Sequence, residues 1–323
     1  MVYALIFIII FFSVVLIKAA DLSIIGLRRI AKKTHTGVFA ISAFILALGT
    51  SFPELFVGIT SALEGESELA LGVVMGSNIA NISLVAGSAA LFAGAVVVRG
   101  DYIKRDVSIA LFAGVLPLIL LLDGSLNRVD GLILLAVYVA YASSFFRERY
   151  KDIAEEHKKE NFATRFFREF THMNGDITKE YGRLFIGIAL LLLSADVIVK
   201  ASGSLGVIMG IDVFVVGLIL IAIGTSLPEL AFSVRSLEDH QPSMFFGNLL
   251  GSVIANSTLV IGLVCLISPI VIDSYSQYLI AGLTFVIVAL LFWTFIRSKH
   301  RLDRWEALAL VFVYVVFVVA EFL

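Results

Sequence analysis

Charged side chains are scarce in this chain, and so are cysteine and histidine. Only 15% of the 323 residues are charged, whereas a soluble domain of ordinary composition carries about 25%. The single cysteine, Cys265, excludes an intramolecular disulfide. The five histidines fall in polar connections, and no His-Glu-x-x-His pattern occurs, so a zinc or copper site is not expected. A net charge of −2 gives no reason to expect a nucleic-acid partner.

Long apolar runs fill most of the remaining sequence. Hydrophobic residues make up 59% of the chain, and the mean hydropathy is +1.00. Helices of about 20 apolar residues cross a bilayer, and the alternating pattern of a membrane barrel is missing. The first run lacks the basic start and the cleavage site of a signal peptide, so we interpret it as a span. We therefore predict an all-α, multi-pass protein of the cell membrane, with ten helices near residues 2–20, 37–62, 69–97, 106–122, 130–146, 183–200, 212–236, 243–270, 277–296 and 305–322.

A polar stretch between the fifth and sixth spans divides the chain. We predict a first five-helix repeat over residues 1–146, a cytoplasmic linker over 147–182 and a second five-helix repeat over 183–323. Lys and Arg gather on the cytoplasmic side of membrane proteins. With ten spans, all but Arg128 and Lys200 of the 24 basic residues lie on the side that carries the linker. Both termini are therefore predicted to face outside.

The two halves carry the same motifs 175 residues apart. Ala47–Leu55 matches Ala222–Leu230 at seven of nine positions, and both contain Gly-Thr-Ser-x-Pro-Glu. Gly76–Asn81 matches Gly251–Asn256 through Gly-Ser-x-Ile-Ala-Asn at the same spacing. Because each half has an odd number of spans, the second half enters the membrane in the opposite sense. The repeats are thus predicted to be inverted, with equivalent residues meeting near the middle of the membrane.

The first motif places a carboxylate beside a helix break in each half. Glu54 and Glu229 each follow a proline, which removes a helical hydrogen bond and suits the first turn of a new half-helix. A carboxylate at this depth costs roughly 3 kcal/mol, so it is a functional site by default. Such a break also offers hydroxyls and freed carbonyls, from Ala47, Thr50 and Ser51 in one half and from Ala222, Thr225 and Ser226 in the other. All these ligand atoms are oxygens, which favours hard cations such as calcium and sodium.

The second motif adds a hydroxyl and an amide one helical turn apart. Ser77 and Asn81 share one helix face, and Ser252 and Asn256 repeat the arrangement. The asparagines can ligate a cation or hold a carboxylate, and the serines can ligate or pack. The glycines at positions 76, 87, 251 and 262 are expected to mediate close helix packing.

The first and sixth spans contain neither a proline nor one of these motifs. We expect unbroken helices that slide or rock as a gate against a fixed site. Asp21 and Asp196 match at the same spacing and are expected near the ends of these helices, at opposite faces of the membrane.

Transport competes with two other functions. An intramembrane hydrolase could use Ser51 or Ser226 as its nucleophile, but it needs a base, and no histidine lies near either motif. A channel fits a closed, discontinuous site less well than alternating access does. We therefore expect a monomeric transporter in the lipid bilayer rather than an enzyme, without a cofactor. Proton/calcium exchange stays open as an alternative to sodium coupling, with Glu54 and Glu229 as proton carriers.

At these motifs the chain resembles the cation/calcium exchanger superfamily, and within it the prokaryotic sodium/calcium exchangers. The resemblance covers both halves, because each motif occurs twice at a fixed spacing. It implies two inverted sets of five helices around four ion sites, with Glu54 and Glu229 bridging calcium and sodium. It also implies calcium ligands at the Thr50 and Thr225 carbonyls, sodium ligands at Ser51, Ser226, Ser77, Ser252, Ala47 and Ala222, and central positions for Asn81 and Asn256.

Departures from the wider superfamily narrow the choice of ions. Potassium-dependent relatives carry Asp at the position of Asn256, and so do some simple prokaryotic exchangers. Asn256 lowers the charge of the site and argues against potassium. Proton/calcium relatives usually show Gly-Asn-Ala where this chain has Gly-Thr-Ser, which favours sodium. The 147–182 stretch is too short for the calcium-sensing domains of animal exchangers. Sodium/calcium exchange is the function that the sequence predicts.

Overall fold

Helices account for almost all of the computed structural model, which describes residues 1–33, 51–97, 101–154, 176–240, 242–272, 275–299 and 301–321. The first half contains α1 (Val2–Lys33), α3 (Phe52–Leu63), α4 (Ser67–Ala80), α5 (Ala86–Ala93), α6 (Asp101–Leu120) and α7 (Arg128–Ala154). The second half contains α9 (Asp176–Met209), α10 (Val213–Val215), α11 (Ala222–Thr225), α12 (Leu227–Glu238), α13 (Pro242–Ile254), α14 (Ile261–Ile267), α15 (Tyr275–Lys299) and α16 (Arg304–Glu321).

Short irregular helical turns join several of these helices. Three are π-helical, namely η1 (Asn81–Val85), η3 (Val216–Ile221) and η4 (Ala255–Val260), and η2 (Leu121–Asp123) is a 3₁₀ turn. A π turn inserts an extra residue into a helix and occurs frequently at functional sites. Two of the three coincide with the asparagines of the second motif.

The predicted helical membrane protein is confirmed, whereas the number of ten spans stays a prediction. In the described residues, seven segments are long and apolar enough to cross a membrane, namely Val2–Ser23, Ser67–Ala93, Arg105–Asp123, Lys179–Met209, Val213–Glu238, Pro242–Ile267 and Ser276–Ser298. Helices α7 and α16 occupy the expected spans 130–146 and 305–322. The expected span 37–62 lies partly outside the described residues, and α3 forms its end as a shorter apolar helix.

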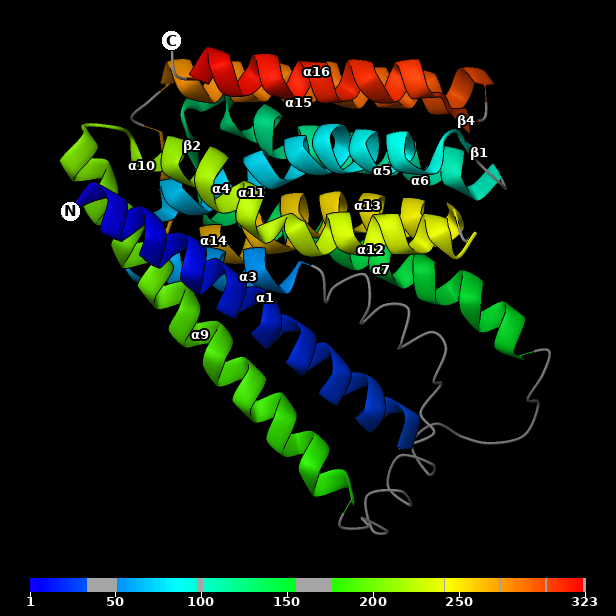
Figure 1. Cartoon of the computed structure of the whole chain (residues 1–323), viewed down its shortest axis with the longest axis horizontal. Helices are drawn as coiled ribbons and strands as arrows, with labels where there is room; N and C mark the ends of the chain where they lie inside the picture. The colour runs from blue at the N-terminus through cyan, green and yellow to red at the C-terminus, as the bar shows by residue number, and fades with distance from the viewer. Residues whose placement is uncertain are drawn as a thin grey trace.

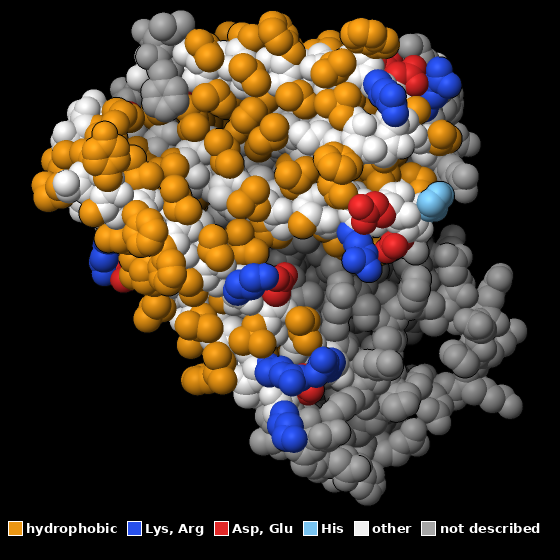
Figure 2. All heavy atoms as spheres, viewed as in Figure 1, with side chains coloured by type: hydrophobic (Ala, Val, Ile, Leu, Met, Phe, Trp, Pro, Cys, Tyr) orange, Lys and Arg blue, Asp and Glu red, His pale blue; other side chains and the backbone are white. Residues whose placement is uncertain are grey.

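Apolar side chains also cover the outside of the molecule. Figure 2 shows them spread over most of the visible face, with the charged side chains gathered toward one end and the lower edge. Large exposed side chains include Phe7, Phe112, Phe185 and Phe312, each more than half exposed. Soluble monomers rarely expose contiguous apolar surface of this extent, so this surface suits a lipid environment.

The elements of the first half recur in the second at nearly the spacing of the motifs. Helices α3 and α12 begin at Phe52 and Leu227, and α4 and α13 begin at Ser67 and Pro242. The long helices α1 and α9 likewise correspond, as do α6 and α15. The described elements that follow the first motif therefore have the same order in both halves.

Two short antiparallel ribbons join the halves. Strand β1 (Val96–Val97) pairs with β4 (Arg301–Leu302), and β2 (Ser125–Leu126) pairs with β3 (Ile270–Val271). Each ribbon takes one strand from each half, and Figure 1 shows β2 and the β1–β4 pair at opposite ends of the molecule. Both ribbons bury one apolar pair, Val96 with Leu302 and Leu126 with Ile270. The expected absence of barrel strands holds for the described residues, which contain only these four two-residue strands.

Helices α1 and α9 lie side by side and are steeply inclined to the other helices (Figure 1). They approach closely, since a side chain at Gly187 would strike Ser23 and the Ala19 carbonyl. Both helices extend well beyond the predicted spans 2–20 and 183–200. No proline interrupts either segment, and charged side chains can be solvated where a helix leaves the bilayer. The expectation that Asp21 and Asp196 lie near helix ends is wrong, because both lie well inside these longer helices.

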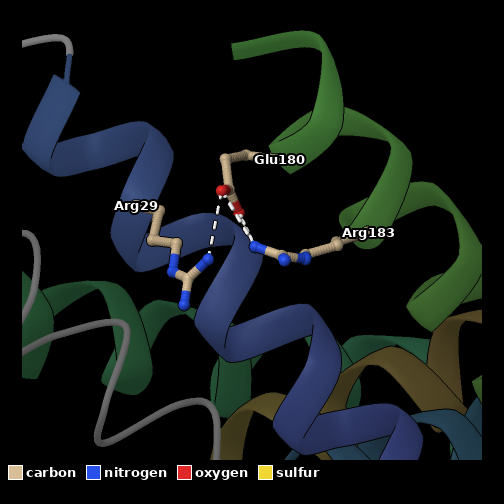
Figure 3. A network of polar contacts seen from close by, with 3 residues as sticks. All are labelled: Arg29, Glu180 and Arg183. Atoms are coloured by element: carbon tan, nitrogen blue, oxygen red, sulfur yellow. Dashed lines mark hydrogen bonds and ion pairs between the residues drawn. The ribbon is translucent and has the colours of Figure 1, made fainter. Parts of the chain in front are cut away.

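An ionic cluster joins the two long helices near one end. Glu180 of α9 is 5% exposed, and its carboxylate accepts hydrogen bonds from Arg29 of α1 at 3.2 Å and from Arg183 at 2.9 Å (Figure 3). Farther along α9, the Lys200 Nζ lies 2.7 Å from Asp196 and 3.5 Å from Glu64, which follows α3. Exposed ion pairs of this second kind contribute little to stability, about 0–1 kcal/mol. They do mark where α9 touches the rest of the molecule.

Close helix crossings explain the expected packing glycines. A side chain at Gly76 of α4 would strike the backbone of Leu218 and the Ala222 side chain. In the same way, Gly87 lies against the Ala307 carbonyl, and Gly262 lies against the carbonyl of Gly131. Packing is thereby confirmed for Gly76, Gly87 and Gly262. The crossing at Gly76 brings α4 directly against the chain leading into the second Gly-Thr-Ser motif.

Candidate functional site

A break in the helix separates α11 from α12 within the second motif. Ser226 leaves the helical path with φ −84° and ψ −2°, and Pro228 and Glu229 then form the first turn of α12. Ser51 has nearly the same conformation, with φ −86° and ψ 7°, before Pro53 and Glu54 at the start of α3. The predicted half-helix start is confirmed in both halves. An acidic residue at this position is favoured by the helix dipole.

Part of the first motif cannot be placed. Ala47 and Thr50, both predicted ligands, lie outside the described residues. Their counterparts Ala222 and Thr225 are described and are 0% and 1% exposed.

The two motif glutamates are completely buried. Glu54 and Glu229 are both 0% exposed. Oε1 of Glu54 accepts a hydrogen bond from Ser77 at 3.1 Å, whereas its Oε2 and both carboxylate oxygens of Glu229 have no hydrogen-bond partner among the described residues. Burying an ionised carboxylate without a partner costs several kcal/mol. The site therefore requires a cation or a proton to neutralise these two groups.

A hydrogen-bonded chain crosses from one half to the other at Glu54. Ser77 Oγ lies 3.1 Å from Oγ1 of Thr225, and Thr225 Oγ1 lies 3.3 Å from the Ala222 carbonyl. That carbonyl also accepts the Ser226 N–H at 3.0 Å. The predicted residues Glu54, Ser77, Thr225 and Ala222 thus lie together, although they come from α3, α4 and α11.

The remaining predicted side chains that the structure describes are also buried. Ser51, Ser226, Ser252, Asn81 and Asn256 are each at most 3% exposed. The hydroxyls of Ser51 and Ser226, both amide atoms of Asn81 and the Oδ1 of Asn256 have no hydrogen-bond partner in the described parts of the chain. Such groups are costly to bury, at about 1–3 kcal/mol each. These groups lie on segments that carry or contact the two glutamate helices, and their oxygen atoms suit a hard cation.

Each glutamate helix packs against the π turn of the other half. Helix α3 contacts η4 and α14, and Gly58 of α3 lies directly against Val260. Helix α12 contacts η1 and α5. Each carboxylate-bearing helix is thereby positioned beside the asparagine-bearing turn of the opposite half.

Sequence comparison of the halves missed two polar residues. Asn78 and Ser257 are 3% and 1% exposed, and Nδ2 of Asn78 donates to Oγ of Ser257 at 2.7 Å. Their counterparts at the 175-residue spacing are Val253 and Ile82, so a search for repeated residues passes over them. Their polarity inside an apolar segment was the available signal.

The donor set suits hard cations. No group of three or more His, Cys, Asp or Glu side chains placed to hold a metal occurs among the described residues. The site instead combines two carboxylates with hydroxyl, amide and carbonyl oxygens, which calcium and sodium accept. Neither Ser51 nor Ser226 bonds to a base in this part of the chain, so the hydrolase alternative gains no support.

Comparisons with known proteins agree with this arrangement. The family model described as sodium/calcium exchanger protein matches residues 4–147 and 179–323. The chain is 30% identical to the sodium/calcium exchanger MaX1 of Methanosarcina acetivorans, with 96% of each protein covered. It is 30% identical to the inner membrane protein YrbG of Escherichia coli, with 86% of this chain and 90% of that protein covered. Its fold is similar to the solved structure of the sodium-calcium exchanger NCX_Mj, with a TM-score of 0.63, 23% identity and 99% of each chain covered.

Proposed function

The chain belongs to the sodium/calcium exchanger protein family, and we propose that it is a secondary active antiporter that exchanges sodium for calcium by alternating access. The observation that carries the proposal is the pair of fully buried glutamates whose carboxylates lack sufficient hydrogen-bond partners among the described residues. Either one calcium ion or two sodium ions neutralises two carboxylates. The two cargoes can therefore replace one another at a single site.

The proposed ligand set takes equivalent oxygens from both halves. Glu54 and Glu229 bridge calcium and sodium at the centre. The other members of the set are Thr50, Thr225, Ser51, Ser226, Ser77, Ser252, Ala47, Ala222, Asn81 and Asn256. Burial of every member that the structure describes supports the set. All members come from one chain, so we propose that the monomer is the functional unit.

We propose that the two halves are inverted in the membrane, with both termini outside and residues 147–182 in the cytoplasm. The ribbons support inversion, because β1 and β3 are equivalent by position and lie in different ribbons, as do β2 and β4. An exchange of the halves therefore exchanges the two ends of the molecule. The continuous helices α1 and α9 are the proposed gate, since they lie together and cross the other helices steeply.

Proton/calcium exchange is the second candidate. Glu229 favours it, because two buried carboxylate oxygens without a partner in the described residues are satisfied by a proton as well as by a cation. The neutral hydroxyls and amides around the glutamates favour sodium instead, since a proton has no use for them.

Calcium uptake into vesicles loaded in turn with sodium, protons or potassium tests the proposal. We expect an outward sodium gradient to drive uptake, a pH gradient alone to give none, and added potassium to make no difference. Uptake driven equally well by protons without sodium would assign the protein to the second candidate. Failure of calcium to enter under any gradient would refute both.

A further inference from the structure

One buried hydrogen-bonded chain near the site joins the two halves and has no equivalent at the matching positions. Nδ2 of Asn256 donates to Oδ1 of Asn78 at 3.3 Å, and Nδ2 of Asn78 donates to Oγ of Ser257 at 2.7 Å. The positions equivalent to Asn78 and Ser257 are Val253 and Ile82, which have no polar side-chain atoms. The equivalent positions therefore cannot form the same hydrogen-bonded chain.

These hydrogen bonds determine which end of the Asn256 amide remains available to a ligand. An asparagine side chain has a donor end, the NH₂ group, and an acceptor end, the carbonyl oxygen. Asn78 occupies the donor end of Asn256. The acceptor end, Oδ1, is buried without a hydrogen-bond partner among the described residues. Asn81 differs, because neither end of its amide has a partner in the same residues.

The side chains that surround Asn78 offer few other hydrogen-bond partners. Asn78 and Ser257 line a small pocket between α4, α6 and α15, whose other walls are mostly apolar and include Leu71, Val74 and Phe285. A buried amide that loses its hydrogen-bond partner destabilises the fold, so both hydrogen bonds are maintained. Successive hydrogen bonds polarise one another. Donation from Asn256 to Asn78 thereby makes the Asn256 oxygen a better ligand for a cation.

We propose that Asn78 is a positioning residue, which holds the Asn256 amide with its oxygen directed to the cation site. The inference rests on the proposed function, because it treats Asn256 Oδ1 as a neutral calcium ligand. It also makes the two motif asparagines unequal. Asn256 is fixed as an acceptor, whereas Asn81 can present either end of its amide.

The first test compares Asn78→Val with the matched variant Val253→Ala, which shortens a fully buried side chain at the equivalent position. Calcium uptake is measured in sodium-loaded vesicles as a function of calcium concentration. Loss of a residue that orients a metal ligand typically weakens binding about 10- to 100-fold. We expect Asn78→Val to raise the KM for calcium about tenfold with little change in maximal rate, and Val253→Ala to leave KM unchanged.

A double-mutant cycle then separates positioning from general damage to the fold. If Asn78 acts through Asn256, Asn78→Val should add no further increase in KM to an Asn256→Ala protein. Independent effects would multiply in the double variant, and that outcome would overturn the inference. Ser257→Ala is the second probe should Asn78→Val fail to fold, with an increased KM expected and an unchanged KM contradicting the proposal.

The proposed function and the positioning role of Asn78 are refuted by different results. A wild-type protein that takes up no calcium in exchange for sodium would refute the proposed function. Normal wild-type uptake, together with an unchanged KM in folded Asn78→Val, would refute only the positioning role.

Discussion

The hydroxyl oxygens of Ser77 and Thr225 lie 3.1 Å apart and connect the Glu54 carboxylate to the second half. Ser77 donates its proton to Oε1 of Glu54. Oγ1 of Thr225 also lies within hydrogen-bonding distance of the Ala222 carbonyl, at 3.3 Å, and that carbonyl accepts the Ser226 N–H as well. Two hydroxyls, one from each half, therefore link a carboxylate of the first half to a carbonyl that is a proposed ligand in the second.

Glu54→Gln and Glu229→Gln are each expected to abolish calcium transport without unfolding the protein. Each change removes one of the two formal charges that neutralise calcium, and ligand charge strongly sets calcium affinity. Glu238→Gln, at the exposed end of α12, is the matched control and should transport normally. Calcium flux into vesicles is the measurement, with gel filtration as the check on folding. Near-normal flux in either motif variant would remove that glutamate from the site.

Thr225→Val should weaken transport, whereas Thr225→Ser should preserve most of it. Valine keeps the shape of threonine but cannot donate to Ser77, so the chain that ends on Glu54 is interrupted. Thr258→Val is the control, because among the described residues the Thr258 hydroxyl bonds to the Ile254 carbonyl one turn earlier, at 2.6 Å, and not to the Glu54 chain. We expect the apparent sodium affinity to fall about tenfold in Thr225→Val, the scale of losing a residue that orients a metal ligand. Equal effects of Thr225→Val and Thr258→Val would argue against a role for the chain.

The proposed topology predicts which introduced cysteines an impermeant thiol reagent can reach. Val129, 63% exposed at the start of α7, should be labelled from outside when changed to Cys, and Asp239→Cys should be labelled only from inside. Cys265 is fully buried and gives little background. Ser67 is a poor site for this purpose, because it is only 6% exposed. Labelling of both cysteines from the same side would contradict inverted repeats.

Cross-linking distinguishes movement of α1 and α9 together from movement between them. Cysteines in place of Arg29 and Glu180, whose side chains meet at 3.2 Å, would link the two long helices to each other. Cysteines in place of Lys200 and Glu64, whose side chains approach to 3.5 Å, would link α9 to the end of α3. We expect a short cross-linker to leave transport intact in the first pair and to block it in the second. The opposite result would mean that α1 and α9 do not move as one gate.

His240→Gly should stabilise the protein. His240 has a φ of 57° in the turn after α12, whereas the equivalent turn after α3 uses Gly65 with a φ of 83°. A side chain in this left-handed region costs roughly 1–2 kcal/mol, although the His240 ring contacts the Glu238 carbonyl at 2.9 Å. We expect about 1 kcal/mol of added stability for glycine and a loss for valine, measured by thermal unfolding in detergent. A destabilised glycine variant would show that the ring contact outweighs the backbone strain.

Much of this structure could be predicted because both motifs depend on local chemistry. A proline suits the first turn of a helix, so the helix starts beside Glu54 and Glu229 were readable from Pro53 and Pro228 in the sequence. The repeat also predicted that Ser77 and Thr225 would be near both glutamates. The π turns were not predictable, because one inserted residue leaves the apolar pattern almost unchanged. The length of α1 was missed as well, since hydropathy marks where lipid ends and not where a helix ends.

Asn78 could not be found by comparing the two halves, because Val253 occupies the equivalent position. Comparing the halves finds residues that both need, and it discards whatever one half has alone. The contact between Asn78 and Ser257 forms because the fold brings α4 and η4 together. Neither segment's own sequence indicates that contact.

The two ribbons affect how each half would behave if it were produced as a separate polypeptide. Each half supplies one strand to each end of the molecule and completes neither end by itself. Expressed alone, either half would carry two unpaired strand edges, and unpaired edges invite another chain to pair with them. Two separately produced halves should therefore recognise each other at both ends, and a single half should associate with a second copy of itself before it is stable.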